Sequence, residues 1–109
     1  MLLVSFILLA TQAAAPALPQ LTALQQGALT CSATFALDAS RPGADEEQAV
    51  RGREFFVRTL ARIMDETGAG REAIVALVGT EAQRLAAEPE RLASVLPACR
   101  SLLDASGIP

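Results

Sequence analysis

Only two cysteines occur in this 109-residue chain, Cys31 and Cys99, and they limit how it can fold. Apolar neighbours recur around both at three- and four-residue steps, so each cysteine is expected on the inward face of a helix. Two inward-facing cysteines on the first and last helices of one small domain most simply form a single disulfide. In the chain-entropy model, closing a loop of about 70 residues stabilises the fold by at most about 4 kcal/mol. The pair therefore predicts that these two helices lie against each other.

An apolar segment without charged side chains, Met1–Ala17, opens the sequence. Its apolar run ends after about ten residues, which is too short for a membrane-spanning helix of about 20. Small residues follow the run, as they do at the cleavage site of a secretory signal peptide. We expect residues 1–17 to be a signal peptide, cleaved after Ala14 or Ala17, and residues 18–109 to form a single helical domain. An uncleaved anchor and a buried N-terminal helix are the alternatives.

Composition indicates the source and the compartment. All nine basic residues are arginines, and the chain has no His, Lys, Tyr, Trp or Asn. Because Lys, Asn and Tyr have AT-rich codons, their shared absence indicates a GC-rich bacterial genome. A bacterial signal peptide leads to the periplasm or the medium, and both permit disulfides. The net charge of −3 predicts solubility and argues against a nucleic-acid surface, which normally needs a concentrated basic face.

Helical spacing continues through the rest of the chain. The first helix is expected to have Pro19 in its first turn and to end near Asp38–Ser40, before the breaker Arg41-Pro42-Gly43. The second opens at Ala44–Glu47 and ends at Gly68, which is expected to adopt a left-handed conformation. The apolar stripes of these helices are Leu21, Leu24, Ala28, Cys31 and Phe35 on the first and Ala49, Phe56, Leu60 and Ile63 on the second.

Two further helices complete the prediction. The third begins near Arg71 and is preferred as one continuous helix, although a capping box at Thr80–Gln83 could start a new one. The fourth has Pro89 in its first turn, is expected to kink at Pro97 and closes at Gly107. The predicted fold class is all-α, a compact four-helix domain with one disulfide joining the first and last helices. The side chains expected to be most buried are Phe56, Leu60, Ile74 and Leu96.

The sequence offers few groups for chemistry. Without His or Lys, the usual catalytic triads, His-containing zinc sites, phosphate-loop lysines and Schiff bases are excluded. A reactive thiol needs a nearby His or a C-x-x-C spacing, and neither is present. Asp45-Glu46-Glu47 is interpreted as a solvated helix start and Asp65-Glu66 as an exposed helix end. We expect no catalytic, cofactor-binding or metal-binding residues, and a protein that is not an enzyme.

Residues 60–77 contain the rhythm xxxTGxxREAxxxL, with Thr67-Gly68 in the turn and Arg71-Glu72-Ala73 after it. This segment resembles the helix-turn-helix of repressor-like and antitoxin DNA-binding domains. The resemblance would place Arg71 at the start of a recognition helix, where base contacts are made. The adjacent Glu72, the net negative charge and the predicted export signal all argue against DNA binding, which stays an alternative.

A second resemblance surrounds the cysteines, in Thr30-Cys31-Ser32-Ala33-Thr34-Phe35 and in Pro97-Ala98-Cys99. These residues resemble small periplasmic acid-stress chaperones with one disulfide. The resemblance implies a helical dimer that loosens at low pH and exposes apolar surface to unfolded client proteins. This chain departs from that family in the position of Phe35, in a longer stretch between the cysteines and in the absence of Lys.

The main hypothesis is therefore an exported, periplasmic or secreted helical protein that acts without catalysis, through protein–protein or envelope interaction. The expected partner is another protein that the sequence does not identify. No nucleic acid and no cofactor are expected, nor is a membrane span once the signal peptide is removed.

Overall fold

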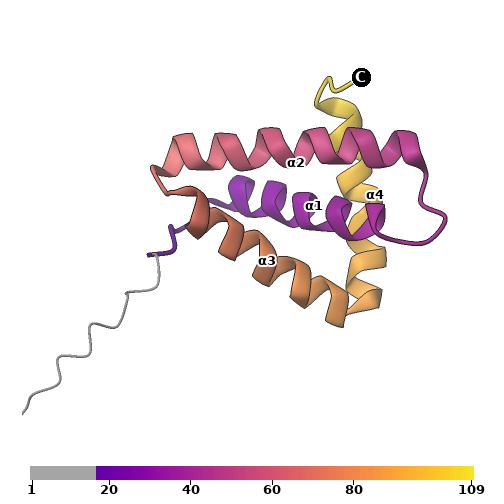
Figure 1. Ribbon diagram of the computed structural model, residues 1–109, viewed down its shortest axis with the longest axis horizontal. Coiled ribbons are helices and arrows are strands. Elements are labelled where there is room, and N and C mark those ends of the chain that lie inside the picture. Colours follow the sequence, from indigo (N-terminus) through magenta and orange to yellow (C-terminus); the bar gives the residue numbers. More distant parts are fainter. Residues whose placement is uncertain (1–16) are drawn as a thin grey trace, which may run out of the picture.

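Four α-helices follow one another along the chain in the computed structural model, which describes residues 17–109 (Figure 1). They are α1 (Ala23–Ala39), α2 (Glu46–Thr67), α3 (Arg71–Ala87) and α4 (Pro89–Ala105). No strand occurs within this described range, so the predicted all-α, four-helix fold class is confirmed. The predicted signal peptide, residues 1–17, lies outside the described residues apart from its last position.

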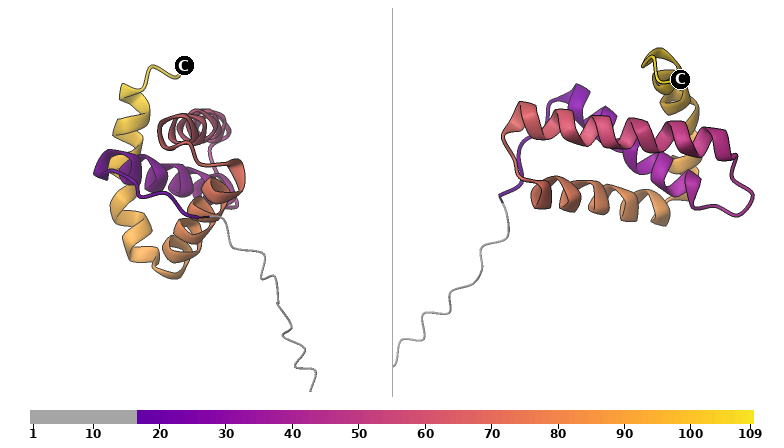
Figure 2. Two further views of the ribbon diagram at one scale, coloured as in Figure 1. Left: turned by 90° about the vertical axis from the view of Figure 1, so that its left-hand side faces the viewer. Right: turned by 45° about the horizontal axis from the view of Figure 1, so that its top comes forward.

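Helix α1 runs through the middle of the domain, with α4 on one side and α2 and α3 on the other (Figure 2). Its residues 31–35 are buried without a break, so this stretch has no face toward solvent. Such a surrounded helix must satisfy every polar group that it buries. The hydroxyls of Ser32 and Thr34 do so by donating to the carbonyl oxygens of Ala28 and Thr30, at 2.9 and 2.8 Å.

Local signals fix the ends of α1 and α2. The Thr22 hydroxyl accepts from the Gln25 amide at 3.1 Å, and the Gln25 side chain accepts from the Thr22 amide at 2.9 Å, a reciprocal cap. Asp45 caps α2 through its carboxylate. Gly68 ends α2 with a φ of 71°, as predicted. The prediction that α1 already includes Pro19 is wrong, because the Thr22 cap starts the helix later.

The boundaries of α3 and α4 agree with the sequence prediction. Helix α3 begins at Arg71 and continues through Gly79 without interruption. Helix α4 has Pro89 in its first turn, continues through Pro97, and is followed by Gly107 with a φ of 78°. The kink expected at Pro97 stays a prediction.

The larger of two cores, here called the first core, lies between α1, α2 and α3. The predicted Leu60 and Ile74 belong to it, at 8% and 1% exposure. Its buried members are Leu29, Ala33, Leu60, Ile63, Ile74, Val78 and Leu85.

The second core lies between α1, α2 and α4. The rings of Phe35 and Phe55 meet edge to face, with centroids 5.3 Å apart. Gly52 permits this contact, because a Cβ there would lie 3.0 Å from the Phe35 Cβ. The buried members of the second core are Cys31, Phe35, Phe55, Cys99, Leu103 and Ile108.

The predicted stripe of α2 needs correction. Phe56 is half-buried, whereas its neighbour Phe55 is buried. Helix α2 buries the face that carries Gly52, Phe55 and Thr59, together with Leu60. Gly52 and Thr59 are not counted as apolar in a search for helical periodicity. The periodicity therefore placed Phe56, rather than Phe55, in the core.

Two further core predictions are wrong. Leu24 is 84% exposed because it lies in the first turn of α1, outside the stretch that the other helices surround. Leu96 shares a helix face with Cys99 and Leu103, but it is half-buried because it lines a hollow open to the surface, together with Leu92 and Asp38. Leu21 precedes α1 and packs at the edge of the first core rather than within the helix.

Candidate functional site

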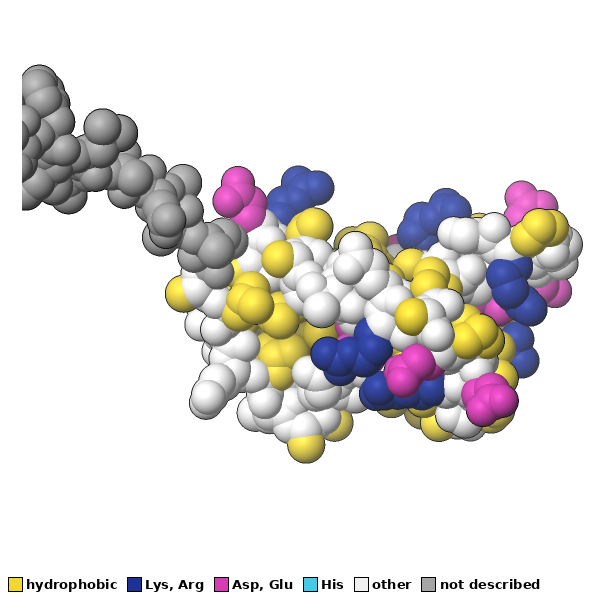
Figure 3. Space-filling view, turned by 90° about the horizontal axis from the view of Figure 1, so that it is seen from below, with side chains coloured by type: hydrophobic (Ala, Val, Ile, Leu, Met, Phe, Trp, Pro, Cys, Tyr) yellow, Lys and Arg dark blue, Asp and Glu magenta, His cyan; other side chains and the backbone are white. Residues whose placement is uncertain are grey.

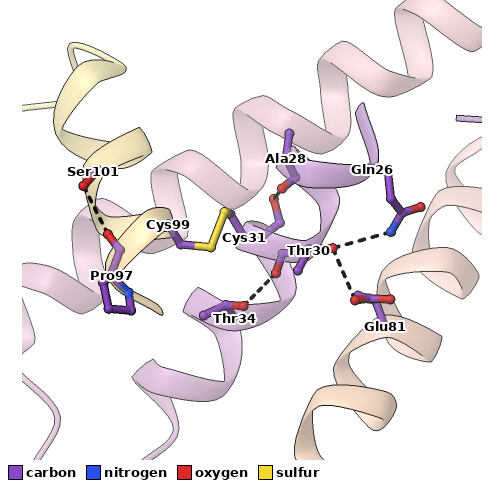
Figure 4. Close-up of a disulfide and its surroundings, with 10 residues drawn as sticks. Gln26, Ala28, Thr30, Cys31, Thr34, Glu81, Pro97, Cys99 and Ser101 are labelled. Atoms are coloured by element: carbon purple, nitrogen blue, oxygen red, sulfur yellow. Dashed lines mark hydrogen bonds between the residues drawn. A yellow bond between two sulfur atoms is a disulfide. The ribbon is translucent and has the colours of Figure 1, made fainter. Parts of the chain in front are cut away.

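A disulfide joins Cys31 in α1 to Cys99 in α4, with their Cα atoms 5.2 Å apart (Figure 4). The predicted pairing of these two residues is thereby confirmed. Both cysteines are buried in the second core. Because they are the only cysteines in the chain, the bridge leaves no free thiol to act as a nucleophile or metal ligand.

A buried acid, Glu81, lies across α1 from the disulfide. Glu81 of α3 is 4% exposed, and its carboxylate accepts a hydrogen bond from the Thr30 hydroxyl at 3.2 Å (Figure 4). The same hydroxyl accepts from the Gln26 side chain at 3.5 Å. Guanidinium groups of Arg84 and Arg91 lie 3.4 and 3.9 Å from the carboxylate oxygens. One carboxylate therefore links α1, α3 and α4, with its charge partnered on two sides.

Sequence reasoning missed Glu81 as a buried residue and considered it only within the alternative capping box. A signal was nevertheless present, because Glu81 continues the helical stripe Ile74, Val78, Leu85 at a core position. An acid on such a stripe must find partners when the stripe is buried. The partner on α1 is 51 residues away in sequence, so periodicity alone does not reveal it.

The acidic runs considered as candidate sites have structural roles or lie in solvent. Asp45 caps α2, and Glu46 and Glu47 occupy its exposed first turn. Asp65 and Glu66 are exposed near the end of the same helix. Among residues 17–109, no group of three or more His, Cys, Asp or Glu side chains is placed to hold a metal ion.

The segment that resembles a helix-turn-helix, residues 60–77, spans the end of α2, a three-residue connection and the start of α3. Arg71 is the first residue of α3 and is exposed, and the adjacent Glu72 is exposed as well. Leu60 and Ile74 belong to the first core, so part of this segment's apolar pattern serves packing. DNA binding by this segment stays a prediction.

Two of the surface hollows formed by the described residues have arginine in a mainly apolar wall and no acidic lining residue. The α1–α2 hollow, of about 330 Å³, is lined among others by Phe35, Ala39, Phe56 and Arg53. The second, here called the three-helix hollow, has about 240 Å³ and lies between α1, α2 and the end of α4. Its walls include Ala28, Phe55, Arg58, Arg62, Leu102 and Ala105.

On the face seen from below, hydrophobic side chains gather toward the left, and Arg and acidic side chains are scattered over the rest of the face (Figure 3). Because charges of both signs are interspersed, this face does not form a field of one sign. No helix within residues 17–109 has the length and hydropathy needed to cross a membrane.

Comparison with protein-family models, with curated proteins and with solved structures finds no match to this chain.

Proposed function

We propose that this protein is a non-catalytic interaction module that works outside the bacterial cytoplasm, in the periplasm or the medium. The observation that carries the proposal is the buried disulfide between α1 and α4. Disulfides persist in oxidising compartments, whereas the cytosol keeps thiols reduced. The apolar segment Met1–Ala17 supports the same compartment, since its length and small residues are typical of a signal peptide.

The side chains that could do chemistry support an interaction role over catalysis. Both thiols are used in the bridge, and the buried carboxylate of Glu81 is held by a hydroxyl and two guanidinium groups. A general acid or base needs a carboxyl group that reaches a substrate in a pocket. Glu81 instead ties helices together, so binding of a protein or envelope component is the better hypothesis.

The compartment is tested by recovering the protein from fractionated cells. We expect it in the periplasm or medium, beginning at Ala15 or Leu18, with no thiol detected by alkylation after denaturation without reductant. A chain that begins at Leu18 behind an initiator Met is the matched control, and it should remain in the cytoplasm with two reactive thiols. An intact Met1 on full-length protein that stays in the cytoplasm would contradict the proposal.

The second candidate is an acid-stress chaperone, which the resemblance around Cys31 and Cys99 suggests. The observation that favours it is a helical domain closed by one disulfide. At about pH 2–3, such a protein should bind a dye specific for apolar surface and suppress the aggregation of an unfolded client. A protein that stays compact there and does not protect the client would rule this candidate out.

A further inference from the structure

The three-helix hollow differs in charge from the rest of the molecule. The whole chain carries more acidic than basic residues, with a net charge of −3. Yet Arg58 and Arg62 both line this hollow, and none of the described residues lining it is acidic. The hollow is thus a local cationic site in an anionic protein, which favours an anionic ligand.

The two arginines are placed to act together. Residues four apart in a helix lie on the same face, so Arg58 and Arg62 extend from neighbouring turns of α2. The Nε atom of Arg58 donates to Glu54 at 2.7 Å, which leaves the two terminal amino groups of that guanidinium for another acceptor. None of the ion pairs found within residues 17–109 involves Arg62. Guanidinium groups bind carboxylates through paired hydrogen bonds.

The remaining walls of the hollow are mostly apolar, with the hydroxyl side chains of Thr59 and Ser106 among them. Phe55 and Ala28 come from α2 and α1, and Ala105 comes from the end of α4. At its margin lie Leu24 and Leu102, which are 84% and 41% exposed and are therefore available to cover an apolar ligand. Covering this exposed apolar surface is favourable, at about 25 cal/mol for each Å² removed from water.

We propose that the three-helix hollow binds a single-chain anionic amphiphile, of which a medium-chain fatty acid is the simplest example. The acyl chain lies along Ala28, Phe55 and Ala105, and the carboxylate bonds Arg58 and Arg62 at the rim. With about 30 Å³ for each water-sized group, 240 Å³ accommodates roughly eight heavy atoms. That size is close to the eight carbons of octanoate and much smaller than the two full acyl chains of a membrane phospholipid.

The proposal goes beyond the interaction role above and does not depend on export. It concerns the folded, disulfide-bonded domain in any compartment. Failure of the signal peptide prediction would leave it unaffected, and absence of ligand binding would leave the compartment unaffected.

The test uses the purified, disulfide-bonded protein, uniformly labelled with ¹⁵N, and sodium octanoate kept below its micelle concentration. We expect saturable binding of one octanoate per chain, with the largest amide shifts at Ala28, Thr59 and Ala105. Octanol and octylammonium, which have the same chain with a neutral or a positive head, should bind at least roughly tenfold more weakly, because charge-assisted hydrogen bonds are lost.

Variants separate this hollow from nonspecific attraction. The double variant Arg58→Gln/Arg62→Gln should weaken octanoate binding by roughly tenfold or more. Arg53→Gln removes a charge from the α1–α2 hollow on the same helix and is the control, for which affinity should change by less than about twofold. Ala105→Leu narrows the hollow while keeping a strong helix former and both arginines, so it should also reduce binding.

Three results would overturn the proposal. Equal binding of octanoate and octanol would show an apolar site without anion selectivity. Equal loss in Arg53→Gln and in the double variant would show nonspecific charge attraction. Binding only to vesicles that contain anionic phospholipid, with no shifts from free octanoate, would point to a membrane surface rather than a single-chain ligand.

Discussion

Gly52 lies where the backbone of α2 passes against the Phe35 side chain of α1. A Cβ at this position would lie 3.0 Å from the Phe35 Cβ, an atom that cannot move without its backbone. Overpacking of this kind costs about 1–3 kcal/mol, and the gain in helix propensity from Gly to Ala returns at most about 1 kcal/mol. We therefore expect Gly52→Ala to lower the free energy of unfolding by about 1 kcal/mol in urea titration.

Gly79 provides the matched control for this prediction. It also lies inside a helix, but an added Cβ there meets nothing within 4 Å. Gly79→Ala should therefore raise the free energy of unfolding by about 0.5–1 kcal/mol through helix propensity alone. An equal rise in the free energy of unfolding for both variants would show that α1 and α2 do not approach closely at Gly52.

Two substitutions of the buried Glu81 distinguish the contribution of its charge to stability from that of its hydrogen bond and packing. Arg84 and Arg91 are half-exposed, so their attraction to the carboxylate is weakened by solvent. Glu81→Gln keeps an acceptor for the Thr30 hydroxyl and should cost less than about 1 kcal/mol. Glu81→Ala loses that acceptor and leaves a cavity, and should cost about 2–3 kcal/mol.

Denaturant titration of the two Glu81 variants measures this difference. Equal losses for Gln and Ala would show that the ion pairs, rather than the hydrogen bond and packing, account for the stability that Glu81 provides.

For the helices, the sequence predicts where each one ends better than it predicts which face of each is buried. The ends depend on neighbouring residues, such as the Gly68 cap, the Pro89 start and the Arg41-Pro42-Gly43 break, and these agree with the structure. The buried face depends on what packs against it. Phe55 and Phe56 are equally apolar, and only the contact with α1 through Gly52 decides which one is buried.

The candidate sites show the same division. The Cys31–Cys99 bridge was predictable because two cysteines allow only one pairing within the chain. The Glu81 cluster and the three-helix hollow were not predicted. Each joins residues from three parts of the chain, and single-sequence periodicity describes one helix at a time.

The register of α2 can be tested with its two adjacent phenylalanines. Phe55 is buried in the second core, whereas Phe56 is half-buried at its surface. Phe55→Ala should lower the free energy of unfolding by about 3–5 kcal/mol, and Phe56→Ala by clearly less. Leu60→Ala, in the first core, is the reference and should cost about 2–5 kcal/mol.

Chemical denaturation of the three α2 variants gives the comparison directly. A larger loss of unfolding free energy for Phe56→Ala than for Phe55→Ala would show that Phe56 is the core residue, as the apolar periodicity predicted. A loss below about 0.5 kcal/mol for Leu60→Ala would show that the first core is assigned wrongly.

Across the whole molecule, α1 and α2 supply buried residues to both cores, whereas α3 supplies them only to the first core and α4 only to the second. The fully buried part of the first core comes from α1, α2 and α3, and α4 adds only the partly buried Leu92 and Val95. In the second core, α4 supplies Cys99 and Leu103. Helix α4 is therefore held mainly through the second core and its disulfide.

This arrangement predicts that reduction of Cys31–Cys99 loosens the molecule unevenly. The bridge contributes at most about 4 kcal/mol, comparable to the stability of a small domain. Local stability follows the contacts that each segment keeps. After reduction, amides of α4 should exchange with solvent much faster, whereas those around Ile74 and Val78 should keep more of their protection.

Hydrogen exchange followed residue by residue, with and without reductant, measures this difference at low temperature. The variant Cys31→Ala/Cys99→Ala without reductant is the control, because it removes the bridge but exposes the protein to no reducing agent. It should show the same pattern, with α4 the least protected helix. Equal acceleration in all four helices would mean that the two cores open as one unit, since α1 and α2 would then transmit the loss of the disulfide to α3.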